Sequence, residues 1–185
     1  MIPATTAFCI CDFETTGVDT DKDYPIEIGC IFTDRTFSTL GIYQDLISWP
    51  DLMVSGDSID PDWNEHDQQA ANIHKISYET YINGAVPLST VVGNVKDIVD
   101  KILNKFYKRV ILISDNIQFE YRFMSILFKE ANIEWPFHYC GWDSSLLLEL
   151  TNIGDPVPDH RALRDCALLQ RQLIRATEKI GAYRN

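Results

Sequence analysis

Three consecutive segments near the N-terminus are mostly apolar and are bounded by polar turns, a pattern that predicts β-strands. They cover residues 7–13, 25–32 and 36–47, and the first alternates as a central strand does. Because tight turns can join them, we expect three antiparallel neighbours. Residues 49–68 follow as a polar loop region with two prolines, one glycine and six acidic side chains. A short helix at 69–74 is expected to close it.

The rest of the chain alternates between helical and strand-like patterns. The predicted order is a helix at 89–106, a strand at 109–114, a helix capped by Asp115 or Asn116 that runs to about 131, a strand at 137–142, a short helix at 144–150, and a last helix at 162–180 that ends at Gly181. Parallel strands need crossover helices, whereas the first three strands do not. The sequence therefore predicts an α/β domain with a mixed central sheet flanked by helices, as in the RNase H-like architecture.

Length and composition fit one compact domain. The chain has 185 residues, of which 45% are hydrophobic, enough to bury a core without disulfides. We find neither a long apolar run nor a signal-peptide pattern, and we therefore expect a soluble cytoplasmic protein with no membrane contact. The five cysteines are odd in number and mostly lie in apolar runs, which favours reduced core thiols. Cys9 and Cys11 lack a second Cys or His pair to complete a zinc site.

The charge narrows the ways in which this chain can hold a polyanion. Its formal net charge is −11, which disfavours broad electrostatic attraction to nucleic acid. Any polyanion must therefore be held locally, and bound divalent cations would supply positive charge at the reacting phosphate. An acidic chain of this kind can still be a nuclease.

Two carboxylates interrupt the end of the first predicted strand, in the stretch D-F-E-T-T-G at 12–17. Side chains alternate along a strand, so Asp12 and Glu14 point to the same side and repel each other unless a cation lies between them. By themselves they could be ordinary surface acids where a strand reaches solvent. The turn that follows contains Gly17, where exposed backbone can approach a ligand closely, and this favours a metal site.

A second group of polar residues opens the last predicted helix, in the stretch H-R-A-L-R-D at 160–165. His160 is expected in or near the preceding loop, where an imidazole can take a proton from water at neutral pH. Asp165 is expected in the first turns of the helix and can hold a metal. Separately, they could be a loop histidine and a charge that favours a helix N-terminus. Together with Asp12 and Glu14, they supply what a hydrolytic metal site needs.

These stretches resemble the motifs of the DEDDh 3′-to-5′ exonucleases, a family that includes many phage proteins, and the resemblance extends over nearly the whole chain. The first motif matches without a change, and the last matches H-x-A-L-x-D. The stretch N-I-H-K-I-S at 72–77 is similar to the family's I-H-G-I-T/S segment, with Lys75 in place of glycine. A phage-type member would act in the host cytoplasm.

The resemblance implies a reaction and a set of site residues. It implies that His160 is the general base and that four carboxylates bind two Mg²⁺ or Mn²⁺ ions, three of them being Asp12, Glu14 and Asp165. It also implies release of nucleoside 5′-monophosphates from a free 3′ end of DNA or RNA, which we expect to be single-stranded. A polymerase partner is not indicated, and the oligomeric state is left open.

The family's remaining carboxylate belongs to an H-N-x-x-F-D segment, and here the chain reads D-N-I-Q-F-E at 115–120. Glu120 stands at the Asp position, and helical spacing places it on the inward face with Met124 and Leu127. Because Glu is one methylene longer than Asp, the metal position or the rotamer must change. Asp115 is the competing candidate, although with Gln118 it also suits a helix cap. A degenerate site is the third interpretation.

Four further residues are expected on the substrate side. The resemblance places the backbone of Thr15 and Thr16 near the terminal sugar, and it allows substrate contacts by His74 and Asn116. A hydrogen-bonded structural role is the preferred interpretation of His74.

Two other functions remain open. One is a catalytically impaired nucleic-acid-binding or polymerase-associated module of the same fold, silenced by the change at Glu120. The other is an RNase H-fold endonuclease, which would cut a circular strand internally.

Overall fold

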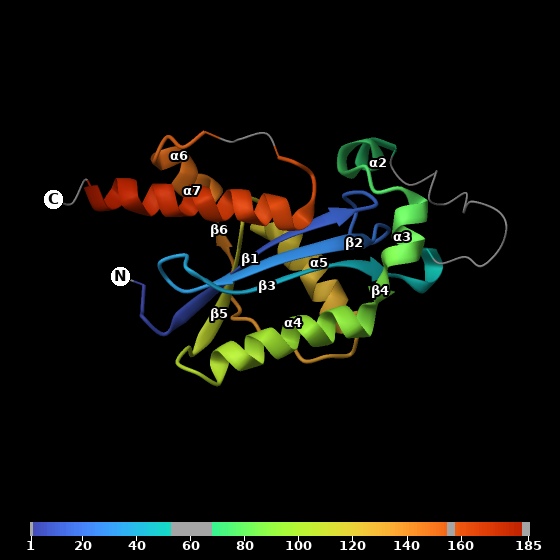
Figure 1. Cartoon of the computed structure of the whole chain (residues 1–185), viewed down its shortest axis with the longest axis horizontal. Coiled ribbons are helices and arrows are strands. Elements are labelled where there is room, and N and C mark those ends of the chain that lie inside the picture. Colours follow the sequence, from blue (N-terminus) through green and yellow to red (C-terminus); the bar gives the residue numbers. More distant parts are fainter. Residues whose placement is uncertain (1, 53–67, 155–157, 183–185) are drawn as a thin grey trace.

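A mixed β-sheet with helices on both faces forms the centre of the molecule (Figure 1). The computed structural model describes residues 2–52, 68–154 and 158–182. Within these ranges the strand order is β4-β3-β2-β1-β5-β6. The strands are β1 (Thr6–Thr15), β2 (Pro25–Thr33), β3 (Thr39–Ser48), β4 (Val86–Pro87), β5 (Arg109–Ser114) and β6 (Trp142–Asp143). The first three are antiparallel neighbours, while β5 runs parallel to β1, β6 to β5 and β4 to β3, as the sequence predicts for the fold class.

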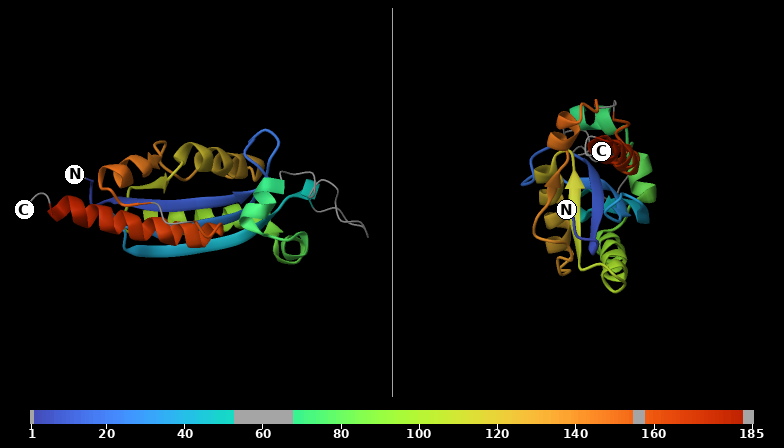
Figure 2. Two further views of the ribbon diagram at one scale, coloured as in Figure 1. Left: turned by 90° about the horizontal axis from the view of Figure 1, so that it is seen from above. Right: turned by 90° about the vertical axis from the view of Figure 1, so that its left-hand side faces the viewer.

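The helices connect and cover these strands. They are the 3-10 turn η1 (Pro50–Leu52) and the helices α2 (Gln68–His74), α3 (Tyr78–Gly84), α4 (Leu88–Leu103), α5 (Ile117–Glu130), α6 (Ser145–Leu150) and α7 (Ala162–Ala182). Figure 1 shows α7 and α4 on opposite faces of the sheet. Figures 1 and 2 place the N-terminal end of β1 and the C-terminal end of α7 at the same end of the molecule. No helix in the described ranges is long and apolar enough to cross a membrane.

The central strand β1 is buried on both of its faces. Alternate side chains of β1, including Cys9 and Cys11, pack into the core cluster on the side of α4 and α5. The intervening side chains Phe8 and Ile10 join a second cluster with α7. Continuing this alternation, the side of β1 that faces α7 ends in Asp12 and Glu14. All five cysteines are free and four of them are buried, in agreement with the prediction of reduced thiols.

Most elements lie where the hydrophobic pattern predicts them, and the exceptions are short. The predicted strand at 137–142 is wrong except at its last residue, because β6 covers only Trp142–Asp143. The predicted strand start at 36–38 is also wrong, because Asp34 accepts hydrogen bonds from the backbone of Thr36 and Ser38 and closes a turn there.

Other boundaries differ from the sequence pattern as well. Gly181 does not end the last helix but lies within α7, since glycine costs a helix little near its frayed end. The helix α3 and the two-residue strand β4 were not predicted. Of the polar loop region at 49–68, residues 53–67 lie outside the described ranges.

Lys75 has a left-handed backbone conformation, with φ of 56°. It directly follows α2, and its N–H donates to the carbonyl of Ala71 (3.0 Å), as in a helix C-terminal cap. A side chain with a Cβ is strained in this conformation, whereas glycine is not. The left-handed backbone therefore explains why the family's I-H-G-I-T/S segment has glycine at this position.

Replacing Lys75 by glycine is expected to raise the free energy of unfolding by about 0.5–1 kcal/mol, because it relieves this strain. Urea unfolding measures the change. Lys101→Gly is the control, since Lys101 lies in the last turn of α4 and glycine there should lower stability by about 1 kcal/mol. Equal destabilisation in both variants would contradict the prediction.

Candidate metal centre

Three carboxylates converge where β1 ends and α7 begins. One oxygen from each of Asp12, Glu14 and Asp165 lies within 4.8 Å of the other two. Asp12 and Glu14 extend from the side of β1 that faces α7, and Asp165 lies in the first turn of that helix. Glu14 is only 7% exposed. The structure thus brings together residues that are about 150 positions apart in the sequence, in the arrangement of a divalent-metal site.

Gly29 allows the helix to come this close to the sheet. It pairs with Asp12 across the β1–β2 ladder. A Cβ at Gly29 would lie 2.4 Å from the backbone carbon of Ala162 and the backbone nitrogen of Leu163. The thiol of Cys166 donates to the Gly29 carbonyl (3.3 Å). The missing side chain therefore lets the backbone of α7 rest directly on β2, which places Asp165 beside Asp12.

A buried ion pair anchors the same helix end. The Glu27 carboxylate, in β2 and opposite Glu14, accepts from Arg161 Nη2 (2.6 Å) and Nε (3.1 Å). It also accepts from the Ala162 N–H (3.1 Å) and from Gln44 Nε2 (2.9 Å). Burial opposes ionisation of Glu27, but these hydrogen bonds outweigh it and lower the pKa of the carboxyl. The sequence reasoning missed Glu27, although an acid inside the apolar segment 25–32 was a detectable signal.

Replacing Arg161 by leucine is expected to lower the free energy of unfolding by about 3 kcal/mol, because Glu27 stays buried without its guanidinium partner. This loss is at the low end of the range for a buried ion pair, because 40% of the Arg161 side chain is exposed, whereas only 1% of the Glu27 side chain is. Because the pKa of Glu27 is lowered on folding, its stabilising effect is present at neutral pH. The stabilising effect is lost as the pH falls below the ordinary pKa of a glutamate carboxyl. The difference in free energy of unfolding between the variant and the unmodified chain should therefore shrink in acid.

Urea unfolding of Arg161→Leu at neutral and acidic pH measures this deficit. Arg164→Leu is the matched control, because the pair of Arg164 with Asp159 is exposed on both sides and should contribute less than about 1 kcal/mol. Equal losses in the two variants would refute a special role for the Glu27 pair.

Glu120 approaches the carboxylate group from α5, on the other face of the sheet. Its side chain is 3% exposed and accepts from Ser114 Oγ (3.2 Å). In the described part of the chain it does not belong to the three-carboxylate group, but its charge contributes to raising the pKa of Asp12. Asp115, the competing candidate, is exposed. Asn116 is also exposed, and it precedes α5 without a capping hydrogen bond from its side chain.

Asp12, Glu14 and Glu120 resist ionisation, because the pKa of each carboxyl is raised. Burial, followed by the charges of Glu120, Glu14 and Asp165, raises the pKa of Asp12 well above its usual value. Burial also raises the pKa of Glu14 to about 8, with further contributions from Glu27 and Asp165. Burial raises the pKa of Glu120 to about 8 as well. A hard divalent cation, which prefers oxygen ligands, fits this excess of buried acid.

Adding Mg²⁺ or Mn²⁺ is expected to stabilise the protein, and more strongly in alkaline than in acidic solution. The folded-state pKa values of Glu14 and Glu120 are raised from 4.5 to about 8. The metal-free fold therefore holds these protons more tightly than the unfolded chain does, and it loses stability as the pH rises between these values. A cation replaces the protons in this range.

The shift in melting temperature at about pH 8.5 and about pH 5.5 tests this expectation. At free metal of about 100 times Kd, the gain at the higher pH should approach about 2.7 kcal/mol. Sodium chloride at equal ionic strength is the control for general screening. A metal-induced shift of the same size at both pH values would count against binding by these carboxylates.

His160 lies in the short segment directly before α7. It is half-buried and has a left-handed backbone, with φ of 51°, a conformation that histidine adopts more readily than most residues. The segment is fixed on both sides, because the Asp159 N–H donates to Asp165 Oδ1 (2.8 Å) and Arg161 pairs with Glu27. The candidate base and the Asp165 carboxylate are thus positioned by one connected network.

His74 is 5% exposed, and its Nδ1 accepts from the Ile76 N–H (2.9 Å). Burial lowers the pKa of His74 to about 4, so the ring is neutral at pH 7. The charges of Glu27, Arg161 and His160 also act on this ring, which places it near the segment before α7. These contacts fit the hydrogen-bonded structural interpretation of His74.

The hydroxyl groups of Thr15 and Thr16 form hydrogen bonds within the chain. Thr15 Oγ1 donates to the Gly17 carbonyl (2.6 Å), and Thr16 Oγ1 donates to Asp23 Oδ1 (3.2 Å). A Cβ at Gly17 would lie 2.4 Å from the Asp23 carboxylate, and φ at Gly17 is not positive. The glycine at position 17 therefore makes room for the Asp23 carboxylate, which is a structural reason for it beside the predicted approach of a ligand.

Comparison with known proteins identifies the fold. No protein-family model and no curated protein sequence matches the chain. Among solved structures, E. coli exonuclease I in complex with a 5cy-dT13 oligonucleotide is similar, with a TM-score of 0.69 and 14% identity over 98% of this chain and 43% of that chain. The zinc-bound E. coli complex with single-stranded DNA has a TM-score of 0.67 and 14% identity, over 98% of this chain and 44% of that chain. Exonuclease I from Methylocaldum szegediense has a TM-score of 0.66 and 16% identity, over 92% of this chain and 40% of that chain.

The chain spans less than half the length of these structures. At this level of identity the likeness shows the fold, which is the RNase H-like fold of exonuclease I.

Proposed function

We propose that this chain is a metal-dependent 3′-to-5′ exonuclease, which removes nucleoside 5′-monophosphates from the end of a single-stranded nucleic acid. The convergence of Asp12, Glu14 and Asp165 at the end of β1 carries the proposal. The fold supports the nuclease class, since similar structures are exonucleases that hold single-stranded oligonucleotides. The motif resemblance supports the 3′ direction. Residues 1–185 would act as one exonuclease domain.

The proposed roles follow from where the side chains lie. Asp12, Glu14 and Asp165 would hold two divalent cations, with Glu120 as the further carboxylate. Bound there, Mg²⁺ or Mn²⁺ supplies positive charge that stabilises the transferring phosphoryl group and makes water more acidic. Glu120 is preferred to Asp115 because it is buried and its charge has the larger effect on the pKa of Asp12, whereas Asp115 is exposed.

The remaining residues would move the proton and hold the substrate. His160 takes the proton from the attacking water, and the ion pair of Arg161 with Glu27 positions its backbone. Because the hydroxyl groups of Thr15 and Thr16 are engaged within the chain, these two residues contribute backbone groups near the terminal sugar.

A catalytically impaired nucleic-acid-binding module of the same fold is the second candidate. One observation favours it: Glu120 lies outside the three-carboxylate group in the described part of the chain. A module of this kind would bind a single strand without turnover.

A strand-degradation assay separates the candidates. With Mg²⁺ or Mn²⁺, the purified chain should shorten a 5′-labelled single strand stepwise and release mononucleotides, while EDTA should stop the reaction. Asp165→Asn, purified in the same way, should be inactive and so exclude a contaminating nuclease. The absence of turnover on DNA and RNA with either metal would refute the enzyme proposal. Cuts in a circular strand would indicate an endonuclease.

A further inference from the structure

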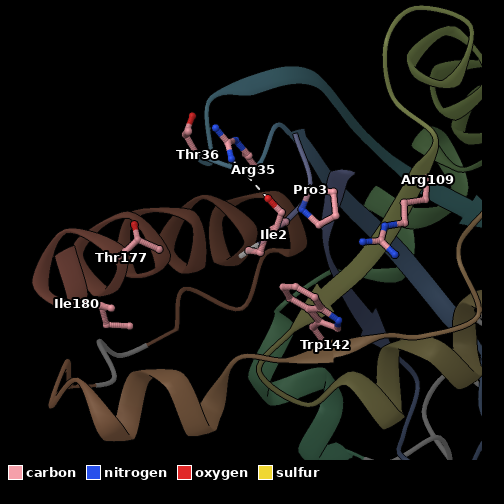
Figure 3. Close-up of a pocket in the computed structure, with 8 residues that line it drawn as sticks. All are labelled: Ile2, Pro3, Arg35, Thr36, Arg109, Trp142, Thr177 and Ile180. Atoms are coloured by element: carbon pink, nitrogen blue, oxygen red, sulfur yellow. Dashed lines mark hydrogen bonds between the residues drawn. The ribbon is translucent and has the colours of Figure 1, made fainter. Parts of the chain in front are cut away.

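A cavity of about 730 Å³ lies beside the first described residues and the last turns of α7 (Figure 3). Its walls come from the N-terminal residues, the turn between β2 and β3, the start of β5, β6 and the last turns of α7. Thr177 of α7 contributes to the lining and follows Asp165 by twelve positions, which is about 18 Å along a helix. A molecule bound here would therefore not touch the candidate metal centre.

Two arginines face this cavity without an acidic partner. Arg109 Nε donates to Thr6 Oγ1 (3.0 Å), which holds the guanidinium in place. Arg35 Nη1 donates to the Ile2 carbonyl (3.5 Å). Within the described ranges, neither arginine has a carboxylate oxygen within 4.0 Å. In a chain with a net charge of −11, two guanidinium groups at one cavity that form no ion pair in the described ranges favour an anionic ligand.

The acid next to Arg35 in the sequence acts on this charge, but the two form no ion pair in the described ranges. Asp34 precedes Arg35, but its Oδ1 accepts from the Thr36 N–H (2.7 Å), the Thr36 hydroxyl (2.6 Å) and the Ser38 N–H (3.0 Å). These hydrogen bonds hold the carboxylate in its own turn, so its charge offsets that of Arg35 only from a distance, without a direct ion pair.

An aromatic ring completes the cavity. Trp142 is 38% exposed, and its ring contacts Phe8 with a centroid distance of 5.2 Å. The core thus fixes the indole while part of it faces the cavity, where Pro3 and Ile180 provide further apolar wall. Figure 3 shows Arg109 pointing toward Pro3 and Trp142, with Arg35 on the far side of Ile2. A flat apolar ring beside a fixed guanidinium suits a ligand that joins an aromatic base to a phosphate.

We propose that this cavity binds a nucleoside 5′-monophosphate, with its base against Trp142, its phosphate at Arg109, and Arg35 adding charge from the opposite wall. The arginines provide the positive charge, so this binding needs no divalent metal. The chemistry of the lining selects the ligand class. Only the supply of the ligand rests on the proposed function, because a nucleoside 5′-monophosphate is the product of that reaction.

Equilibrium dialysis of the full chain with labelled AMP or dAMP, in the presence of EDTA, tests the proposal. We expect one saturable site. Arg109→Gln, Arg35→Gln and Trp142→Ala should each weaken binding about tenfold or more. Arg175→Gln is the matched control, because Arg175 is exposed on α7 outside the cavity and its loss removes the same charge. Binding to this control variant should stay within about twofold of the unmodified chain.

Several outcomes would overturn the assignment. They are the absence of saturable binding at millimolar nucleotide, an equal loss in Arg175→Gln, and displacement of AMP by inorganic phosphate at the same concentration as by AMP itself. Binding that requires Mg²⁺ and disappears in Asp12→Asn would place the nucleotide at the carboxylates and would also refute the proposal. Binding in EDTA by a chain without nuclease activity would support the cavity while the proposed function fails.

Discussion

Asp12→Asn is expected to abolish hydrolysis of a single strand and at the same time to stabilise the metal-free fold. Burial raises the pKa of Asp12, and the charges of Glu120, Glu14 and Asp165 raise it further. Asparagine keeps the shape of the side chain but removes the charge that would hold a cation. Loss of several kcal/mol of transition-state stabilisation corresponds to a decrease in rate of about 10³-fold or more.

The same substitution removes electrostatic repulsion. In alkaline solution and without metal, the neutral amide should raise the free energy of unfolding, since folding disfavours the charged form of Asp12. Such an exchange of activity for stability is typical of residues kept for function.

Two measurements check this pair of effects: single-strand degradation with Mg²⁺, and urea unfolding in EDTA. Asp97→Asn is the control, because Asp97 is an exposed acid on α4, and both quantities should stay near those of the unmodified chain. If Asp12→Asn retained activity, or if it destabilised the metal-free fold, Asp12 would not be a metal ligand under charge repulsion.

Gly29→Ala is expected to reduce activity about 100-fold and to lower the free energy of unfolding by about 1–3 kcal/mol. The added methyl group would lie 2.4 Å from the backbone of Ala162 and Leu163, and backbone cannot rotate away as a flexible side chain does. The first turn of α7 must therefore shift, and Asp165 shifts with it. A displacement of about 1 Å is enough to impair catalysis of this kind.

Gly93→Ala provides the matched control for Gly29→Ala. Gly93 lies within α4, and nothing comes within 4 Å of a Cβ built there. Alanine at this position should stabilise the protein by up to about 1 kcal/mol and leave activity unchanged. If Gly29→Ala behaved as this control does, the close contact between α7 and β2 would not determine the position of Asp165.

The sequence was sufficient to predict the elements that have a clear period. The run at 109–114 coincides with β5, and the helices α4, α5 and α7 were all predicted close to where they lie. For α4 and α5, packing against the sheet imposes helical spacing on the apolar residues. The two-residue strands β4 and β6 are too short for a period. Their pairing depends on neighbouring strands, with Trp142 for example lying opposite Ile113.

The candidate site was predictable to a similar degree. The same-side placement of Asp12 and Glu14 follows from strand alternation alone, and the motif resemblance singled out Asp165. Glu27 and Gly29 were missed because their importance depends on tertiary contacts. Both act on the start of α7, more than 130 positions later in the chain. The acid inside the apolar segment 25–32 signals a buried charge, but no local pattern identifies its distant partner.

The burial of β1 on both faces has a consequence for how the site opens and closes. With β2 along one edge, β5 along the other edge up to Ile10, and a core cluster on each face, we expect β1 to contain some of the slowest-exchanging amide hydrogens of the fold. Asp12 and Glu14 therefore sit on the most persistent element, whereas Asp165 and His160 depend on a helix end anchored at Glu27 and Gly29. Local opening of that helix end would separate the two halves of the site while the strand and its two carboxylates remain folded.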